Sequence, residues 1–551
     1  MKRTGATELI EQLRKQGVLE VVGIPGGNIL PFYDALVNSP LRHILARHEQ
    51  GAAFIAQGMA RASGNPAVCI ATSGPGATNL LTGLADAWRD SIPIIAITGQ
   101  VPRKFIGSQA FQEIDIISMA KHCTKATYAI THANEIATII PKAFAQASQG
   151  RPGPVLIDIP RDVFLEEVSL DVIAPCMNIF PISAKPWEHH LGKARALIAE
   201  AKRPLLYIGG GIIHGNAAES LRAFSTSLNI PVLSSLMGLG AMRSDDPLFL
   251  GMLGMHGHPV ANMALAECDL LIVAGARFDD RATGRLDSFA PSARVIHIDN
   301  DEGEFHRMRR ADCVLHGCAD SVLATLQEQL PISDTKHQQW IARLEILRME
   351  YPMPLQSAHQ WIQALASTIG DDCLVTTDVG QHQMWTAQSF PFSRPRQWLT
   401  SGGLGTMGFG LPAAIGAALA CPTQSVLCIS GDGSLSMNLQ ELATLAECGA
   451  SVKICMFDNA GLGMVRQQQH LFFGERYSAC DYTQQIDWCS IANGFGIPAI
   501  SVTKPSDLGW RKLLCELGPA FIRIAMPCEE LVWPHVPAGK SNSEMLMGCN
   551  G

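Results

Sequence analysis

The chain has 551 residues, of which 47% are apolar and 17% are charged, and its formal net charge is −8. This length predicts about three domains, and the apolar content favours large, well-buried α/β domains over a disordered or fibrous chain. The acidic balance argues against a nucleic-acid or anionic-membrane surface, because no basic excess exists to neutralise phosphates.

The 16 cysteines are scattered and include no C-x-x-C pair, so we expect free or buried thiols in a reduced compartment, the cytoplasm. Near the start of the chain, Glu8 and Glu11 occur before any apolar stretch develops. This pattern is typical of an amphipathic helix rather than a signal peptide. The sequence has no long uninterrupted apolar run, which predicts that no segment spans a membrane.

A first domain is predicted over residues 1–165, where short apolar runs alternate with helix-like stretches. The predicted strands are Val68–Ala71, Ile92–Thr98 and Val155–Ile159, and the predicted helices are Ala52–Ala62 and Ala77–Trp88. Alternation of this kind predicts βαβ units and a parallel sheet with helices on both faces. Residues 162–187 lose the periodicity and contain several prolines, which predicts a linker.

Two further α/β blocks follow the linker. A central domain over residues 188–325 has predicted strands at Leu205–Ile208, Pro231–Ser234, Leu270–Ala274 and Val295–Asp299, followed by a charged helix at Gln338–Glu350. A third domain over residues 356–526 has predicted strands at Cys373–Thr377, Val426–Ser430 and Val452–Asp458, and a helix at Asn438–Cys448. A tail over residues 527–551 is rich in Pro, Gly and Ser. The predicted fold is α/β, with three doubly wound parallel-sheet domains.

Two polar motifs follow neighbouring strands of the third block. Asp432 lies between two glycines directly after one predicted strand, and Asn459 comes directly after the next. The carboxyl ends of parallel strands meet at one edge of a sheet, where α/β proteins bind ligands. Asp432 and Asn459 offer oxygen ligands for Mg²⁺, and flanking glycines let the backbone approach a diphosphate. Either motif alone is more often a turn, but the spaced pair strongly indicates a metal-diphosphate site.

This pair resembles the metal-diphosphate motif of thiamine-diphosphate enzymes. The resemblance implies that Asp432, Asn459 and a main-chain carbonyl near Gly461 hold Mg²⁺. It also implies that the diphosphate contacts Gly431, Gly433 and Ser434.

Thiamine cofactors also require a carboxylate on the aminopyrimidine ring. Glu49 opens an alanine-rich helix, and a Glu in the first turn of a helix is often only a favourable partner of the helix dipole. The segment Arg47–Ala53 nevertheless matches the glutamate motif in the first domain of this family. The resemblance implies that Glu49 is the acid that activates the cofactor.

From about residue 4 to residue 546 the chain resembles the large catalytic subunits of acetolactate synthases. The matching stretches are residues 69–79, 150–155, 275–281, 377–385, 403–410, 530–534 and 541–546. The resemblance implies a pyrimidine-binding, a central and a diphosphate-binding domain. It implies a homodimer or larger oligomer, with the cofactor between the first domain of one chain and the third domain of another. A small regulatory subunit is a further expected partner.

The implied reaction decarboxylates pyruvate and joins the remaining two-carbon unit to a second 2-keto acid, which is pyruvate or 2-ketobutyrate. In this family Gln112 would lie near the reacting groups, and Met407 would be an apolar wedge that bends the cofactor. A Met at a glycine-rich turn often only packs, so core packing is the alternative for Met407. Other residues expected to contact the cofactor by the same resemblance are Gly405, Gln381, His382 and Met464.

The central domain of this family often holds FAD that performs no net redox step. Gly209–Gly211 is weak evidence alone, because three glycines after a strand more often form a tight turn. Arg277 and Asp299 match the family's FAD-lining segments better. Arg277 could alternatively clamp the carboxylate of a keto acid, because a guanidinium fork suits that group.

Three positions depart from the family pattern, one of which is Arg161, where a Lys is common. Gln468 stands where a Trp is usual, a residue implicated in the preference for 2-ketobutyrate, and Asn28 replaces a usual Ala close to the reacting carbon. Such changes are worth roughly 1–3 kcal/mol of substrate discrimination. They leave open a related thiamine-diphosphate decarboxylase, oxidase or other carboligase. A non-catalytic binding subunit would need a broken site, yet Glu49, Asp432 and Asn459 are all present.

Overall fold

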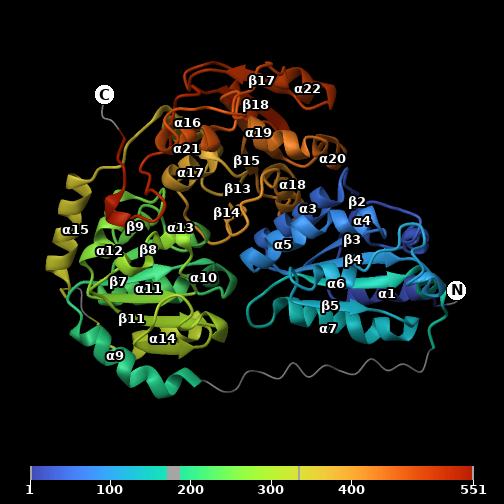
Figure 1. Cartoon of the computed structure of the whole chain (residues 1–551), viewed down its shortest axis with the longest axis horizontal. Helices are drawn as coiled ribbons and strands as arrows, with labels where there is room; N and C mark the ends of the chain where they lie inside the picture. Colours follow the sequence, from blue (N-terminus) through green and yellow to red (C-terminus); the bar gives the residue numbers. More distant parts are fainter. Residues whose placement is uncertain (1–2, 170–185, 333–334, 549–551) are drawn as a thin grey trace.

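Each of the three α/β blocks is built on one six-stranded sheet in the computed structural model (Figure 1). The structure describes residues 3–169, 186–332 and 335–548, so most of the predicted linker lies outside the described residues. Every strand pairing within the three sheets is parallel. The prediction of an α/β chain with three doubly wound parallel sheets is confirmed.

In the first domain (blue to cyan in Figure 1) the strand order is β2-β1-β3-β4-β6-β5. The strands are β1 Glu20–Gly23, β2 Arg42–Leu45, β3 Ala67–Ala71, β4 Ile94–Gln100, β5 Ala126–Ala129 and β6 Val155–Pro160. The helices are α1 Gly5–Lys15, α2 Leu30–Leu36, α3 Glu49–Ser63, α4 Pro75–Asn79, α5 Leu81–Asp90, α6 Ile116–Ala120, α7 Ile136–Ser148 and α8 Arg161–Leu165. Strands β3 and β4 are buried along their whole length, because separate apolar clusters cover the two faces of the sheet.

The third domain has the strand order β14-β13-β15-β16-β18-β17. Its strands are β13 Leu374–Thr377, β14 Trp398–Leu399, β15 Val426–Gly431, β16 Val452–Asp458, β17 Ala499–Val502 and β18 Ala520–Ala525. Its helices are α16 Ser357–Ile369, α17 Gln381–Ser389, α18 Gly410–Ala420, α19 Asp432–Leu435, α20 Glu441–Cys448, α21 Gly463–Phe472, α22 Trp488–Gly494 and α23 Trp510–Cys515. When the strands of each domain are numbered from its own first strand, the two sheets have the same strand order. The two domains share one topology although no repeat is evident in the sequence.

The central domain has a different order, β12-β11-β10-β7-β8-β9, which is the arrangement of dinucleotide-binding folds. Its strands are β7 Pro204–Ile208, β8 Val232–Ser234, β9 Phe249–Met252, β10 Leu270–Ala274, β11 Arg294–Asp299 and β12 Cys313–His316. Its helices are α9 Leu191–Glu200, α10 Gly210–His214, α11 Ala218–Leu228, α12 Pro259–Glu267, α13 Asp280–Thr283 and α14 Ala319–Gln329, and α15 Gln338–Glu350 follows.

Helices α3 and α18 join the first domain to the third at very short range (Figure 1). A Cβ atom on Gly58 would lie 2.0 Å from the carbonyl oxygen of Ala413, and one on Gly416 would lie 1.9 Å from that of Ile55. Only glycine permits this approach of the two backbones. The contact fixes the position of the helix that begins at Glu49 relative to the third domain.

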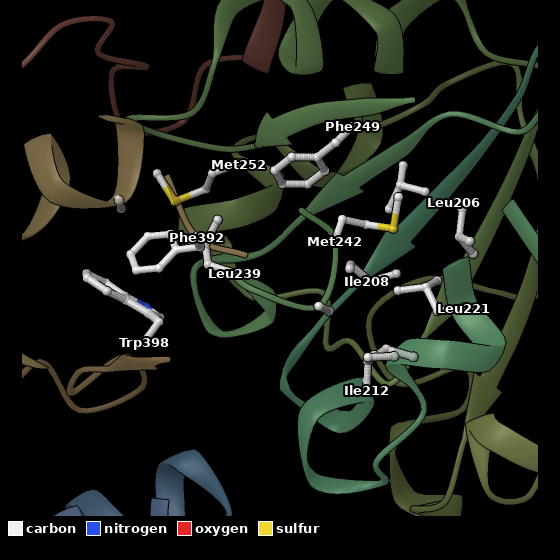
Figure 2. Close-up of a cluster of buried hydrophobic side chains, with 14 of the residues drawn as sticks. Leu206, Ile208, Ile212, Leu221, Leu239, Met242, Phe249, Met252, Phe392 and Trp398 are labelled. Atoms are coloured by element: carbon white, nitrogen blue, oxygen red, sulfur yellow. The ribbon is translucent and has the colours of Figure 1, made fainter. Parts of the chain in front are cut away.

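An apolar cluster joins the central domain to the third (Figure 2). Phe392 and Trp398 come from the segment around β14, and their ring centroids lie 5.1 Å apart. In Figure 2 they lie beside Leu239 and Met252 of the central domain. Burial of these large side chains holds the two domains together.

Several predicted element bounds differ from the structure. The predicted strand Ile92–Thr98 begins two residues later, because the N–H of Ile92 donates to the carbonyl oxygen of Ala87 in α5 and Pro93 has no N–H. The predicted helix Ala77–Trp88 is two helices, α4 and α5, which break at Leu80. None of the helices within the described ranges is long and apolar enough to cross a membrane.

Candidate active site

A cleft of about 500 Å³, partly open to solvent, lies at the carboxyl edge of the third sheet. It sits where β13 and β15 end, the point at which the strand order reverses and α/β sheets bind ligands. Many of the predicted cofactor residues line it: Gln381, His382, Met407, Gly431, Asp432, Gly433, Ser434, Asn459, Gly461 and Met464.

Asp432 directly follows β15 and is the first residue of α19, and it is only 3% exposed. Its Oδ1 accepts a hydrogen bond from the backbone of Gly433 at 2.9 Å, and its Oδ2 accepts one from the backbone of Gly461 at 3.0 Å. Burial, and then the neighbouring carboxylate of Asp458, raise the pKa of Asp432 to about 7. A divalent cation would reverse this shift, because it favours the ionised carboxylate.

Asn459 follows β16, and its side chain is held in one orientation. Its Nδ2 donates to Oε1 of Gln381 at 3.1 Å, which leaves the amide oxygen Oδ1 as the available metal ligand. Gln381 in turn donates to Oε1 of Gln467 at 3.2 Å and to the carbonyl oxygen of Glu530 at 2.9 Å. Asn459 is therefore connected to the tail of the chain through Gln381.

His382 and Met407 are the other prominent side chains of the cleft. His382 is 5% exposed, its Nε2 has no hydrogen-bond partner among the described residues, and burial lowers its pKa to about 3. It therefore stays neutral and has one nitrogen free for a ligand. Met407 lies in a loop in which Gly405 adopts a φ of 72°. The Cε atom of Met407 would lie 3.6 Å from a Cβ on Gly433. Gly405 shapes this loop and is outside the lining of the cleft.

The predicted acid lies in the first domain, at the equivalent edge of its sheet. Glu49 is the first residue of α3, and its Oε2 accepts a hydrogen bond from Nδ2 of Asn79 at 3.0 Å. Its Oε1 faces Gly76, where a Cβ would lie 3.4 Å away. Burial, and then the carboxylate of Glu49, raise the pKa of Tyr33.

Gln112 and Asn28 lie close to the same segment. Gln112 has a positive φ of 62° and packs against Gly74, whose Cβ would lie 2.9 Å from that of Gln112. Asn28 donates from Nδ2 to Oγ of Ser73 at 2.6 Å. Phe111, beside Gln112, is 88% exposed. The loops after β1, β3 and β4 thus converge on one edge of the first sheet.

The structure therefore collects the predicted residues into two groups. Within one chain, neither Glu49 nor Gln112 is among the residues that line the cleft of the third domain. Each group lies at the reversal point of a sheet with the same strand order.

Arg277 and Asp299 lie in the central domain, after β10 and at the end of β11. Burial lowers the pKa of the Arg277 guanidinium and raises that of Asp299 to about 6. His297 shares the strand face of Asp299, is fully buried, and has no hydrogen-bond partner for either ring nitrogen among the described residues. Its ring centroid lies 5.5 Å from that of Phe278.

Other residues of the cleft were not identified from the sequence. Gly463 is needed there, because a Cβ at this position would lie 2.0 Å from Oε1 of Gln381. The Gly-x-Gly spacing of residues 461 and 463 after a strand was the available signal. The remaining unassigned lining residues are Val379, Gly380, Trp385, Phe457, Leu462, Val465 and Met526.

Comparison with protein families gives three matches along the chain. The N-terminal TPP binding domain of thiamine pyrophosphate enzymes matches residues 3–119, the central domain matches residues 191–326, and the C-terminal TPP binding domain matches residues 378–524.

Curated relatives align from end to end. The chain is 48% identical to the acetolactate synthase isozyme 1 large subunit of Escherichia coli (strain K12), over 98% of this chain and 97% of the relative. It is 47% identical to the isozyme 2 large subunit of the same organism, over 98% and 99%. Acetolactate synthase 1, chloroplastic, of Oryza sativa subsp. japonica is 41% identical over 100% of this chain and 88% of the relative. The chain therefore belongs to the thiamine pyrophosphate enzymes and, within them, to the family of acetolactate synthase large subunits.

Proposed function

We propose that this protein is the catalytic subunit of an acetolactate synthase of branched-chain amino-acid biosynthesis. It decarboxylates pyruvate and ligates the remaining two-carbon unit to a second 2-keto acid. The observation that carries the proposal is that the chain has two separate half-sites, each at the same point of a sheet with the same strand order. One half-site offers the acid Glu49, and the other offers the oxygen ligands Asp432 and Asn459.

The third-domain cleft suits Mg²⁺ and a diphosphate. In our proposal Asp432 Oδ, Asn459 Oδ1 and the carbonyl oxygen of Gly461 hold the metal, a set of hard oxygen donors that suits a small divalent cation. Gly431 and Gly433 lie where the diphosphate would approach the backbone. The buried Asp432 carboxylate, and Nε2 of His382, which has no hydrogen-bond partner in the described part of the chain, support a ligand here, because burial leaves each of these polar groups incompletely compensated.

Thiamine diphosphate, when bound, supplies a carbon nucleophile and an electron sink for decarboxylation. Glu49 would hold a proton for the aminopyrimidine ring of the cofactor. Asn79 occupies Oε2 of Glu49 with a hydrogen bond, so Oε1 is the atom available for that proton. Met407 presents an apolar side chain to the cleft. Gln112 packs against Gly74, two residues before the Gly76 that Oε1 of Glu49 faces.

The proposal requires two copies of the chain. Glu49 and Gln112 do not line the cleft of their own third domain, so the first domain of one copy would complete the cleft of the other. The strongly exposed Phe111 next to Gln112 supports a partner surface on this side of the first domain.

Mixed assembly of two inactive variants tests the shared site. Glu49→Gln and Asp432→Ala should each abolish turnover as pure proteins. Co-expressed at equal levels, they should regain about a quarter of wild-type activity, because half of the dimers would then contain one intact site out of two. If acid and metal ligands served the same cofactor within one chain, no mixture would regain activity.

We further propose that the central domain holds FAD as a structural cofactor, near Arg277 and Asp299. The fit rests on the buried charges of these two residues and on the ring nitrogens of His297 on the same strand as Asp299, for which the described residues offer no hydrogen-bond partner. Dialysis followed by flavin fluorescence would detect the release of FAD. A wild-type protein that is purified without flavin and takes none up would contradict this part of the proposal.

The acceptor is a 2-keto acid, either pyruvate or 2-ketobutyrate. Incubation with both acids, thiamine diphosphate, Mg²⁺ and FAD, followed by product identification, tests the reaction. Acetolactate or its ethyl homologue is the expected product, and acetaldehyde or peroxide alone would contradict the synthase. The relatives in Escherichia coli are named large subunits, so the proposal includes a separate small subunit as a partner.

A further inference from the structure

The loop that carries Met407 belongs to the third domain, yet side chains of the first domain hold it. Residues 400–409 connect β14 to α18, and residues 401–407 of this connection form the Met407 loop. Asp90, the last residue of α5, accepts hydrogen bonds from the backbone of Gly402 on Oδ2 at 2.9 Å and of Gly403 on Oδ1 at 2.7 Å. A Cβ on Gly403 would lie 2.9 Å from Oδ1 of Asp90, so this close approach requires glycine.

Asp86, one helical turn earlier in α5, holds the other side of the loop. Its Oδ2 accepts hydrogen bonds from the hydroxyls of Ser401 and of Thr406, the latter at 2.9 Å. The hydroxyl of Ser401 also accepts a hydrogen bond from the backbone of Thr406 at 2.8 Å. Asp86 therefore closes a ring of hydrogen bonds that ends one residue before Met407.

Arg61 of α3 completes the network. Its Nη2 donates to Oδ2 of Asp90 at 2.8 Å and lies 3.5 Å from Oδ1 of Asp86. Its guanidinium carbon lies 5.1 Å from the ring centroid of Phe409, at the start of α18. The loop is thus held from α5 and also from α3, the helix that begins at Glu49.

The network is almost entirely shielded from solvent. Asp86 is fully buried, and Asp90 and Arg61 are 5% and 6% exposed. Two carboxylates share one guanidinium, and the loop's backbone N–H groups and hydroxyls donate further hydrogen bonds to them. Oδ1 of Asp86 and Nε of Arg61 have no hydrogen-bond partner among the described residues, so the hydrogen bonds from the loop are the main compensation for the buried charge. A buried charge that loses such a donor is strongly disfavoured, so the network allows the loop only one arrangement.

We propose that Asp86 and Asp90 are positioning residues that fix the backbone of residues 401–407 and thereby the place of Met407 in the cleft. Neither aspartate lines the cleft itself. A methionine side chain has several rotatable bonds and keeps a defined position only when its supporting groups are rigid. What Met407 does for the cofactor rests on the proposed function, but the anchoring of the loop does not.

Hydrogen exchange of the cofactor-free protein tests the anchoring directly. In Asp86→Asn and Asp90→Asn, peptides covering residues 400–408 should exchange at least about 10-fold faster than in wild type, because local opening becomes less costly. The matched control is Glu8→Gln, which removes another buried carboxylate of the first domain, one paired with Arg3 and remote from the loop. Unchanged exchange in this loop, or an equal increase in Glu8→Gln, would overturn the proposal.

A second measurement separates positioning from general stability. Thr406→Val removes the hydroxyl that Asp86 binds and keeps the side-chain volume, so it tests the bond even if an aspartate variant fails to fold. Asp86→Asn, Asp90→Asn and Thr406→Val should each lower kcat by about 10- to 100-fold, because Met407 would be misplaced in the cleft. The KM for pyruvate should change by less than about twofold. The thiamine diphosphate affinity, followed by tryptophan fluorescence, should fall in parallel.

The double variant Asp86→Asn/Thr406→Val should be no worse than Asp86→Asn alone, because both changes break the same bond. Additive losses would contradict a role through Thr406. If the wild-type protein binds no thiamine diphosphate and forms no acetolactate, the proposed function fails, while the exchange result still decides whether the two aspartates anchor the loop.

Discussion

The side-chain amide of Asn459 donates from Nδ2 to Oε1 of Gln381, so the orientation of a proposed metal ligand depends on the first residue of α17. We expect Gln381→Ala to raise the Mg²⁺ concentration needed for half-maximal activity by about 10- to 100-fold, because residues that orient a metal ligand typically contribute that much. A Mg²⁺ titration of the metal-depleted protein checks this. Gln424→Ala, outside the cleft, serves as the control, and an unchanged Mg²⁺ requirement in Gln381→Ala would contradict the assignment.

The close contact between α3 and α18 predicts a large effect of a single methyl group. Gly416→Ala places a Cβ against the carbonyl oxygen of Ile55, so the helices must separate, and we expect a loss of about 1–3 kcal/mol or more in the free energy of unfolding. Gly192→Ala in α9 is the matched control, because nothing lies within 4 Å of the added Cβ. That change should stabilise the protein by about 0.5–1 kcal/mol. Thermal and urea unfolding measure both, and equal stability of the two variants would argue against the contact.

The buried His256 predicts sensitivity to acid. Burial lowers its pKa to about 3 from the usual 6.5, and His535 lies beside it with ring centroids 4.9 Å apart. The unfolded chain takes up a proton at this residue below pH 6.5 and the folded chain does not, so the stability it contributes is lost as the pH falls from 6.5 towards 3.

His256→Asn keeps a donor for the carbonyl oxygen of Pro534 and removes the titration. Relative to wild type, the free energy of unfolding of the variant should rise by up to about 1.4 kcal/mol for each pH unit below 6.5. Above pH 7.5 the two free energies of unfolding should differ by a constant amount. Melting temperatures measured from pH 8 to pH 5 in the same buffers check this, and parallel curves throughout would show that His256 does not titrate on unfolding.

Acceptor choice is the property most open to change by a single residue. Gln468 is exposed on α21, one turn after Met464, which lines the cleft. We expect Gln468→Trp to raise the preference for 2-ketobutyrate over pyruvate by about 10-fold, because an apolar ring near the acceptor discriminates a methyl group by that order. Competition between the two acids, with quantification of both products, measures it. Gln469→Trp, at the next position of the helix, should leave the product ratio unchanged.

Much of the fold follows from strands that are apolar throughout. Runs such as Leu270–Ala274 and Ala67–Ala71 are buried along their whole length, and a short continuous apolar run is enough to predict them. Edge strands such as Arg42–Leu45 and Ala126–Ala129 were missed, because they are short, partly exposed and contain polar residues. Their positions depend on pairing with neighbours far along the chain, which a local pattern does not contain.

The candidate site was predictable where chemistry requires a rare local motif, and much less so elsewhere. Asp432 and Asn459 lie in such motifs and reach the same cleft. Asp86 and Asp90 have no such signal, because an aspartate within a helix normally indicates a solvent-exposed face. Their partners in the Met407 loop, such as Ser401 and Gly402, lie more than 300 residues away, and only the packing of the two domains brings them together.

The helical segment from residue 75 to residue 90 orients Glu49 through Asn79 at one end and holds the Met407 loop through Asp86 and Asp90 at the other. If two copies pair as proposed, the Glu49 and the Met407 of one chain serve different cofactor molecules. Each chain would then connect two active sites, which the twofold symmetry of the dimer makes equivalent. A change at Asn79 would then affect one active site through Glu49 and the other active site through the Met407 loop.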